Sequence, residues 1–203
     1  MPKKPTEPFG HIAFGRDGSV SKHMNLLSDQ KRLQETEIAN RFAVSISAMT
    51  GKPYEVLELE EANHDFWLVS GEEKIVVQAT ELVGRDYLQP LSLEDYREGR
   101  HDFTEFVYES ETKIYGVDNE AKNRALAKKI QAKSSRYSKP KMPFWLLIWT
   151  VRSDFVAFFT ANQEQRISPA VGAARAELTS TAGLFDEVWF FYPEVNAGRI
   201  WPV

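Results

Sequence analysis

The chain has 203 residues, of which 42% are hydrophobic and 12% aromatic, so it suits a single domain with a substantial core. Cysteine is absent, which excludes disulfides, thiolate nucleophiles and cysteine-ligated zinc, and the net charge of −4 argues against a general nucleic-acid binder. No apolar run approaches a transmembrane span, and the first ten residues lack the apolar core of a signal peptide. We therefore expect a cytoplasmic protein without a membrane partner.

The positive charge is concentrated in one segment. Residues 121–141 hold 8 of the 25 Lys and Arg residues and contain no acidic residue. A basic segment on an acidic body is a candidate surface for binding phosphate groups. The alternative is a solvated helix that pairs with acids elsewhere in the chain, and charge alone does not decide between them. The candidates for nucleic-acid contact are Lys122, Lys128, Lys129, Arg136 and Lys139.

The first elements in chain order are a hairpin and a long helix. Residues 1–27 are predicted to form a loose tail and a hairpin around the turn sequence GRDGS. A helix then begins at Ser28 or Asp29, either of which can cap it, and ends at Gly51. Its apolar residues recur at helical spacing, at Leu33, Ile38, Phe42, Ile46 and Met49.

Two acids accompany the apolar stripe of this helix. Glu35 lies three residues before Ile38 and continues the stripe, whereas Glu37 lies to one side. An acid at the end of a core stripe is either functional or the place where the helix reaches water.

A strand is predicted at residues 54–59, and a hairpin follows from His64 to Leu82 with its turn at residues 70–73. Strand alternation places Asp65 on the face of the first strand that also carries Trp67. On the second strand, Gln78 and Thr80 interrupt an otherwise apolar face. A packed polar pair must be satisfied there, which makes it a candidate site. The alternative, at least as well supported by the pattern, is that this face meets solvent at the strand end.

Residues 86–118 are polar, acidic and aromatic, and we interpret them as an insertion with a short helix at 93–97 and a strand at 103–108. A second helix is predicted at 119–137. Leu126, Ile130 and Tyr137 share one stripe of it, and Lys133 falls on the same stripe. A lysine among inward-facing residues either snorkels to the edge or reaches into a cleft.

The remaining elements complete an α/β pattern. Residues 144–151 are apolar throughout, as expected of a strand covered on both faces. A short strand at 155–160, a helix from 168 to about 181 and a buried strand at 187–192 follow. The order predicts a mixed β-sheet flanked by helices in one domain, residues 1–203.

Several other chemistries are not indicated. The histidines, His11, His23, His64 and His101, form no HxxH or HExxH pair, which argues against a histidine-based zinc site. The chain has no GxSxG elbow, no GxGxxG fingerprint and no Walker A loop.

The element order, with His64-Asp65 and Gln78-Ala79-Thr80, resembles the restriction-endonuclease-like nucleases, the PD-(D/E)XK superfamily. In that family a helix carrying an acid precedes three strands. The second strand carries the Asp of a PD pair, and the third carries an acid, or Gln in some branches, then any residue and Lys. A helix and an apolar strand follow, which residues 130–149 resemble. The resemblance implies an αβββαβ core over residues 28–151, with the insertion at 86–118 and a C-terminal αβ extension at 152–203.

The resemblance also implies metal-dependent hydrolysis of DNA phosphodiester bonds with Mg²⁺ or Mn²⁺. Asp65 would be the main metal ligand, Gln78 and the Ala79 carbonyl secondary ligands, and Glu35 or Glu37 would complete the set. RNA, a protein partner and a homodimer remain open.

Thr80 stands where the family has its motif lysine, and two interpretations follow. In the first, that lysine has migrated to Lys133, which would stand near the attacking water as a catalytic residue beside Asp65 and Gln78. In the second, the chain is a catalytically silent nuclease-like domain that binds nucleic acid or a protein partner.

Overall fold

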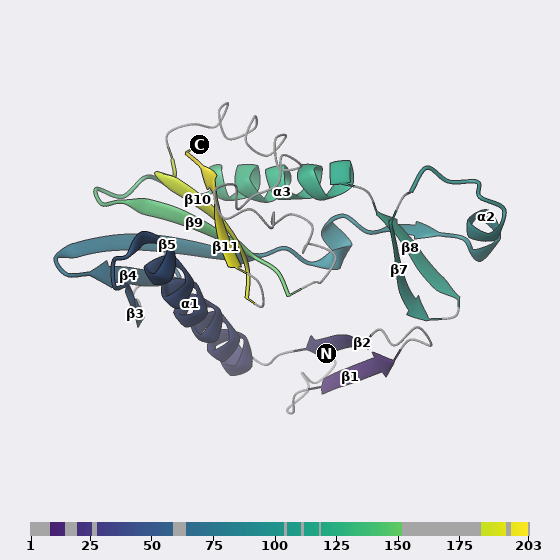
Figure 1. The fold of residues 1–203 in the computed structure, drawn as a ribbon, viewed down its shortest axis with the longest axis horizontal. Helices are drawn as coiled ribbons and strands as arrows, with labels where there is room; N and C mark the ends of the chain where they lie inside the picture. The colour runs from purple at the N-terminus through teal and green to yellow at the C-terminus, as the bar shows by residue number, and fades with distance from the viewer. Residues whose placement is uncertain are drawn as a thin grey trace, which may run out of the picture.

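The main body of the protein is a six-stranded mixed sheet with a helix on each face (Figure 1). The computed structural model describes residues 9–14, 20–25, 28–58, 64–103, 105–110, 112–117, 119–151, 184–193 and 196–202. The strands lie in the order β11-β10-β9-β5-β4-β3. Their bounds are β3 (Glu55–Glu58), β4 (Phe66–Ser70), β5 (Glu73–Glu81), β9 (Phe144–Trp149), β10 (Glu187–Tyr192) and β11 (Asn196–Trp201). The predicted mixed α/β class is confirmed.

The sheet combines an antiparallel half with a parallel centre. Strands β3, β4 and β5 form an antiparallel meander, and β9 pairs parallel to β5. Strand β10 is parallel to β9, and β11 returns antiparallel to β10. Because parallel neighbours need a crossover connection, the chain between β5 and β9 carries helix α3 (Asn119–Ser134). β11 was not predicted from the sequence, whereas β10 matches its predicted range.

Helix α1 (Ser28–Thr50) covers one face of the sheet. Its buried residues Ile38, Phe42 and Ile46 pack against alternate residues of the strands, which include Phe66, Leu68, Ile75 and Val77. Gly51, with a φ of 72°, ends the helix as predicted, and its N–H donates to the Ser47 carbonyl at 2.9 Å. The prediction that Leu33 belongs to the stripe was wrong. Leu33 lies five residues before Ile38, a spacing that places it on another side of the helix, and it is 70% exposed.

Helix α3 covers the opposite face. Leu126 and Ile130 are fully buried against the other alternate set of strand residues, among them Val76, Leu146 and Ile148. Trp67 of β4 and Leu82, just beyond β5, pack in the same cluster. The predicted alternation of the 64–82 hairpin is therefore confirmed, and the face that carries Asp65 and Gln78 is the one beneath α3.

The described residues of 84–103, 105–110 and 112–117 form a lobe that projects to one side of the main sheet (Figure 1). A 3-10 turn (Gly84–Asp86) leads into a three-stranded sheet in the order β6-β8-β7, made of β6 (Gln89–Leu91), β7 (Glu105–Ser110) and β8 (Lys113–Val117). Helix α2 (Leu93–Arg97) matches the predicted range, the predicted strand at 103–108 lies two residues later, and β6 and β8 were not predicted.

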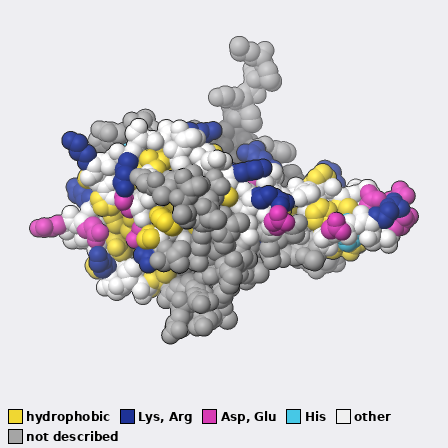
Figure 2. Space-filling view, turned by 90° about the horizontal axis from the view of Figure 1, so that it is seen from above, with side chains coloured by type: hydrophobic (Ala, Val, Ile, Leu, Met, Phe, Trp, Pro, Cys, Tyr) yellow, Lys and Arg dark blue, Asp and Glu magenta, His cyan; other side chains and the backbone are white. Residues whose placement is uncertain are grey.

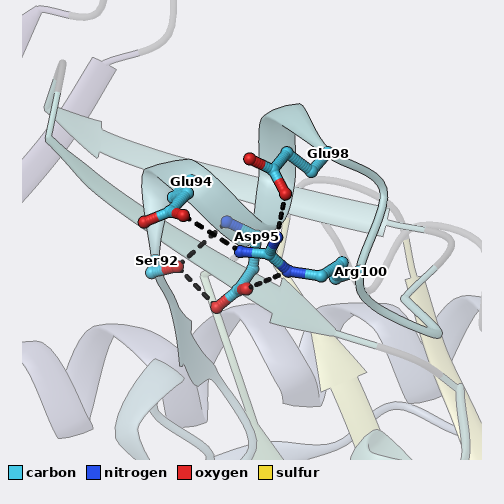
Figure 3. Close-up of polar contacts among 5 residues, drawn as sticks. All are labelled: Ser92, Glu94, Asp95, Glu98 and Arg100. Atoms are coloured by element: carbon cyan, nitrogen blue, oxygen red, sulfur yellow. Dashed lines mark hydrogen bonds and ion pairs between the residues drawn. The ribbon is translucent and has the colours of Figure 1, made fainter.

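The tip of the lobe is held by one arginine. Arg100 contacts the carboxylates of Glu94, Asp95 and Glu98, and the Ser92 hydroxyl caps α2 by accepting the Asp95 N–H (Figure 3). Hydrogen bonds from the Ser92 hydroxyl and from Arg100 lower the pKa of Asp95. These acidic residues therefore stabilise the local structure of the lobe through their contacts with Arg100.

A two-stranded hairpin, β1 (Phe9–Phe14) and β2 (Val20–Asn25), precedes α1 as predicted. The strand predicted at 155–160 and the helix predicted from 168 to 181 lie outside the described residues. Within the described ranges, no helix is long and apolar enough to cross a membrane.

Asp186 joins the start of β9 to the start of β10. Its carboxylate accepts the Phe144 N–H at 2.9 Å and pairs with Lys139 at 2.6 Å, while its own N–H donates to the Phe144 carbonyl at 2.8 Å. We expect Asp186→Ala to lower the free energy of unfolding by about 1–3 kcal/mol, since the Phe144 N–H loses its acceptor. Asp186→Asn keeps an acceptor oxygen and should lose less. Urea denaturation of the three proteins checks this; equal losses in both variants would contradict it.

Glu187 gives the stability a specific pH dependence. Burial raises the pKa of its carboxyl, opposed by hydrogen bonds from Trp189 and Arg199. Because the pKa is higher in the folded than in the unfolded protein, the folded state binds the proton more tightly. The ionised carboxylate therefore lowers the free energy of unfolding at neutral pH. This loss disappears as the pH falls through the pKa of the folded protein towards the ordinary pKa of a glutamate in the unfolded chain, about 4.3.

We accordingly expect Glu187→Gln, which keeps an acceptor oxygen, to remove this dependence. The free energy of unfolding of the native chain should rise relative to that of the variant as the pH falls from 7 to 4.5. Paired urea titrations measure the difference, in which the contributions of all other acids cancel. A difference that is flat or runs the other way would show that burial of Glu187 is not the dominant effect.

Candidate active site

The candidate site lies where β4 ends beside the longer strand β5. Phe66 pairs with Val77, and the Asp65 N–H donates to the Val77 carbonyl at 3.2 Å. Strand β5 continues to Glu81 beyond this point. Alternate residues of a strand direct their backbone groups to the same neighbour, so Ala79 presents its N–H and C=O where β4 no longer pairs with it.

Side chains rather than a strand satisfy these two backbone groups. The Asp65 carboxylate accepts the Ala79 N–H at 2.6 Å, and the Lys133 ammonium donates to the Ala79 carbonyl at 3.2 Å. The Gln78 amide donates to the same Asp65 oxygen and reaches the Ala79 carbonyl at 3.3 Å. A carboxylate, an amide, a carbonyl and an ammonium thus meet at one point.

Ordinary periodicities bring these groups together. Gln78 lies directly opposite Asp65 in the hairpin register, and both side chains face α3. Lys133 lies seven residues after Leu126 on the inner stripe of α3, one turn beyond Ile130. Its ammonium does not simply return to solvent, because it bonds to the edge of β5. The Asp65 side chain is exposed, whereas Gln78 is 3% exposed.

An aromatic wall made of His64, Tyr137 and Phe144 borders the site. The Lys133 ammonium lies 5.7 Å from the centroid of the Tyr137 ring. That ring lies 6.4 Å from His64 and 6.3 Å from Phe144, and His64 lies 5.3 Å from Phe144. Burial, and then the negative charge of Asp65, raise the pKa of Tyr137, so the phenol lies within electrostatic reach of the carboxylate.

Sequence reasoning did not assign His64 or Tyr137 to the site. Tyr137 could have been found, because it follows Lys133 by four residues on the stripe predicted for a helix over 119–137. In the structure α3 ends at Ser134, three residues earlier than predicted, and Tyr137 lies in the segment that follows it. His64 precedes Asp65, and its Nδ1 atom is buried without a hydrogen-bond partner in the structure.

The oxygens of the site suit a hard divalent cation. Mg²⁺ and Mn²⁺ take carboxylate, amide and carbonyl oxygens, and Asp65, Gln78 and Ala79 offer one of each. The Gln78 Oε1 atom is buried and has no hydrogen-bond partner, and a half-turn of the amide would exchange it with the nitrogen that faces Asp65. The described part of the chain contains no cluster of three or more His, Asp or Glu residues able to hold a metal. Asp65 therefore supplies negative charge to this site without belonging to such a cluster among the described residues.

The structure does not join Glu35 or Glu37 to this set. Both lie on α1, which covers the other face of the sheet. Glu37 is exposed and pairs with Arg41 at 3.1 Å, as an ordinary pair one helical turn apart. Glu35 is half-buried on the stripe of Ile38 and Phe42.

The predicted nucleic-acid-binding residues fall into three groups. Lys122 is fully buried and so does not offer its ammonium to a phosphate at the surface. Lys129 pairs with Asp86 at 3.0 Å, and Lys139 pairs with Asp186. Lys128 and Arg136 are exposed. On the face seen in Figure 2, Lys and Arg side chains form separate groups, several of them beside acidic side chains. Lys128 and Arg136 therefore stay candidates for contact with phosphate, whereas Lys122, Lys129 and Lys139 are buried or paired within the fold.

Comparisons with protein-family models, curated proteins and solved structures found no match to this chain. Its function is accordingly argued from the geometry of the site.

Proposed function

We propose that this chain is a metal-dependent nuclease that hydrolyses DNA phosphodiester bonds with a restriction-endonuclease-like core. The observation that carries the proposal is the meeting of the Asp65 carboxylate, the Gln78 amide and the Lys133 ammonium around Ala79. The element order supports it, because α1, the β3-β4-β5 meander, α3 and the parallel strand β9 follow the αβββαβ pattern of that superfamily.

The residues present fit Mg²⁺ or Mn²⁺. Asp65, the Ala79 carbonyl and the Gln78 Oε1 atom would hold the ion, with Gln78 turning its amide. When bound, such an ion activates water and neutralises charge on a phosphate. One carboxylate with two neutral oxygens provides little charge, so we expect weak metal binding before the substrate arrives.

The chain's own cations and carboxylate account for the rest of the proposed chemistry. Lys133 places a positive charge beside the exposed Asp65, where it can donate to an oxygen of the scissile phosphate and stabilise charge that develops there. Asp65 also anchors the Ala79 N–H, which keeps the open edge of β5 in place. Lys128 and Arg136 are exposed on and after α3 and would contact neighbouring phosphates.

Thr80 bears on whether the domain is active. It is half-buried on the same face as Gln78, at the position of the motif lysine. Lys133 reaches the backbone between these two residues from α3. This placement favours a migrated lysine over a silent site. The silent, nucleic-acid-binding alternative is favoured by a different observation: within the described ranges, no three His, Asp or Glu residues gather where they could hold a metal.

The proposal is tested by incubating the purified chain with single-stranded, duplex and branched DNA and with RNA, in Mn²⁺, Mg²⁺ or EDTA. We expect cleavage of DNA that requires the metal and is lost in both Asp65→Asn and Lys133→Met. Cleavage that persists in both variants would point to a contaminant or another site. Binding that weakens with salt, without cleavage under any condition, would support the silent domain instead.

A further inference from the structure

Lys133 contacts the Ala79 carbonyl and the Tyr137 ring at the site, and the carbonyl oxygen is one that the proposed metal needs. Its ammonium donates to the Ala79 carbonyl at 3.2 Å and lies 5.7 Å from the centroid of the Tyr137 ring. Two cations on a single carbonyl oxygen repel each other strongly in a partly buried site. The ammonium must therefore leave that oxygen when the divalent ion arrives.

The Tyr137 ring is placed to receive the displaced ammonium. An aromatic face attracts a cation within about 6 Å of its centroid, so the contact in the metal-free protein is near its outer limit and can strengthen. The ring itself is supported by Phe144 and His64. Tyr137 follows Lys133 by four residues, in the segment just after α3 ends at Ser134, and its ring already lies near the ammonium, so rotation of the lysine side chain can bring the ammonium closer.

We propose that Tyr137 is the positioning residue for Lys133, and that its ring holds the ammonium at the site once the divalent ion occupies the Ala79 carbonyl. The inference rests on the proposed function, because it assigns that carbonyl to the metal. Tyr137 acts through the lysine. Without the ring, the ammonium would either remain on the carbonyl and oppose the metal or move into solvent and leave the phosphate.

The test is a double-mutant cycle in Mn²⁺ affinity, measured calorimetrically on the whole chain without nucleic acid. Lys133→Met removes the competing charge, so we expect Mn²⁺ to bind about tenfold more tightly. Tyr137→Leu should weaken Mn²⁺ binding roughly three- to tenfold, the range of a cation–π contact. Adding Tyr137→Leu to Lys133→Met should change nothing further, because no ammonium remains to be held.

Two control substitutions make the cycle specific. Tyr137→Phe keeps the ring and should bind Mn²⁺ as the native chain does. Arg124→Met removes an exposed charge of helix α3 and should also leave the affinity unchanged. Tyr137→Met provides a second non-aromatic side chain if the leucine variant does not fold.

The outcomes separate this inference from the proposed function. Equal weakening by Tyr137→Leu with and without Lys133→Met would show that the ring has only a structural role, and no weakening at all would equally overturn the inference. Unchanged or weaker Mn²⁺ binding in Lys133→Met would contradict the competition for Ala79. Asp65→Asn is expected to abolish measurable binding; if it binds Mn²⁺ like the native chain, the metal site of the proposed function is itself wrong.

Discussion

Asp65→Asn is expected to reduce the rate of DNA cleavage by at least about a thousandfold, because the variant loses several kcal/mol of metal and transition-state stabilisation. Asp65 brings the negative charge to a set of otherwise neutral oxygens. Asparagine retains an oxygen that can accept the Ala79 N–H, so the open edge of β5 should keep its geometry. The expected result is thus a loss of chemistry without a comparable loss of stability.

Initial rates at saturating Mn²⁺, together with thermal melting, measure the two effects separately. A suitable control is Glu72→Gln, which also neutralises an exposed acid of the same hairpin but lies at its other end, about 20 Å along β5. It should leave the rate within about twofold. If Asp65→Asn retained a tenth of the native rate, Asp65 would not be the main ligand, and if it unfolded, its role would be to hold the backbone.

The parts of the site that could be predicted from the sequence are those that follow from periodicity. Alternation along two strands with a short turn places Asp65 and Gln78 on one face, and the α3 stripe places Lys133 over that face. These are local rules that apply once each element is correctly assigned. The hydrogen bond between Lys133 and the Ala79 carbonyl joins residues that are 54 positions apart in the chain. It depends on the tertiary packing of α3 on the sheet, which no local sequence pattern predicts.

Lys122 shows how one signal obscured another. It lies four residues before Leu126, on the stripe that also contains Ile130 and Lys133, so its burial follows from the same spacing. The density of basic residues indicated a phosphate-binding surface. Lys122 was therefore assigned by its charge and not by its position in the helical repeat. Lys129 and Lys139 differ, because Asp86 and Asp186 are distant in sequence and only the folded chain reveals the pairs.

The lobe was harder to predict because its strands are short and mixed in polarity. Gly116 of β8 packs so closely on the Phe103 ring that a Cβ atom there would overlap it. β8 is the central strand of the small sheet, yet in the sequence KIYGV the glycine weakens the strand pattern. Helix α2 was predictable because Ser92 and the acids after it form an ordinary helix start.

Gln78→Glu should produce the second large effect, a loss of stability in the absence of metal that divalent metal largely reverses. Gln78 is buried, faces Asp65 directly across the strand pair and donates a hydrogen bond to it. The substitution replaces that donor with a like charge, which destabilises an opposed strand pair, more so where it is buried. At pH 8 in EDTA we expect the melting temperature to fall by about 5–10 °C, corresponding to roughly 2–3 kcal/mol in a chain of this size.

Millimolar Mn²⁺ should restore most of that loss, because two carboxylates bind the ion more tightly than one and binding to the folded state stabilises it by mass action. The native chain, with its weaker site, should gain much less from the same addition. Gln131→Glu, the same change at an exposed position of α3, should melt like the native chain with or without Mn²⁺. A Gln78→Glu variant that is not destabilised in EDTA would contradict the direct contact with Asp65. A variant that is destabilised in EDTA but not rescued by Mn²⁺ would support the contact with Asp65 and contradict a metal site at this edge of β5. The silent domain would then be the better explanation of the site.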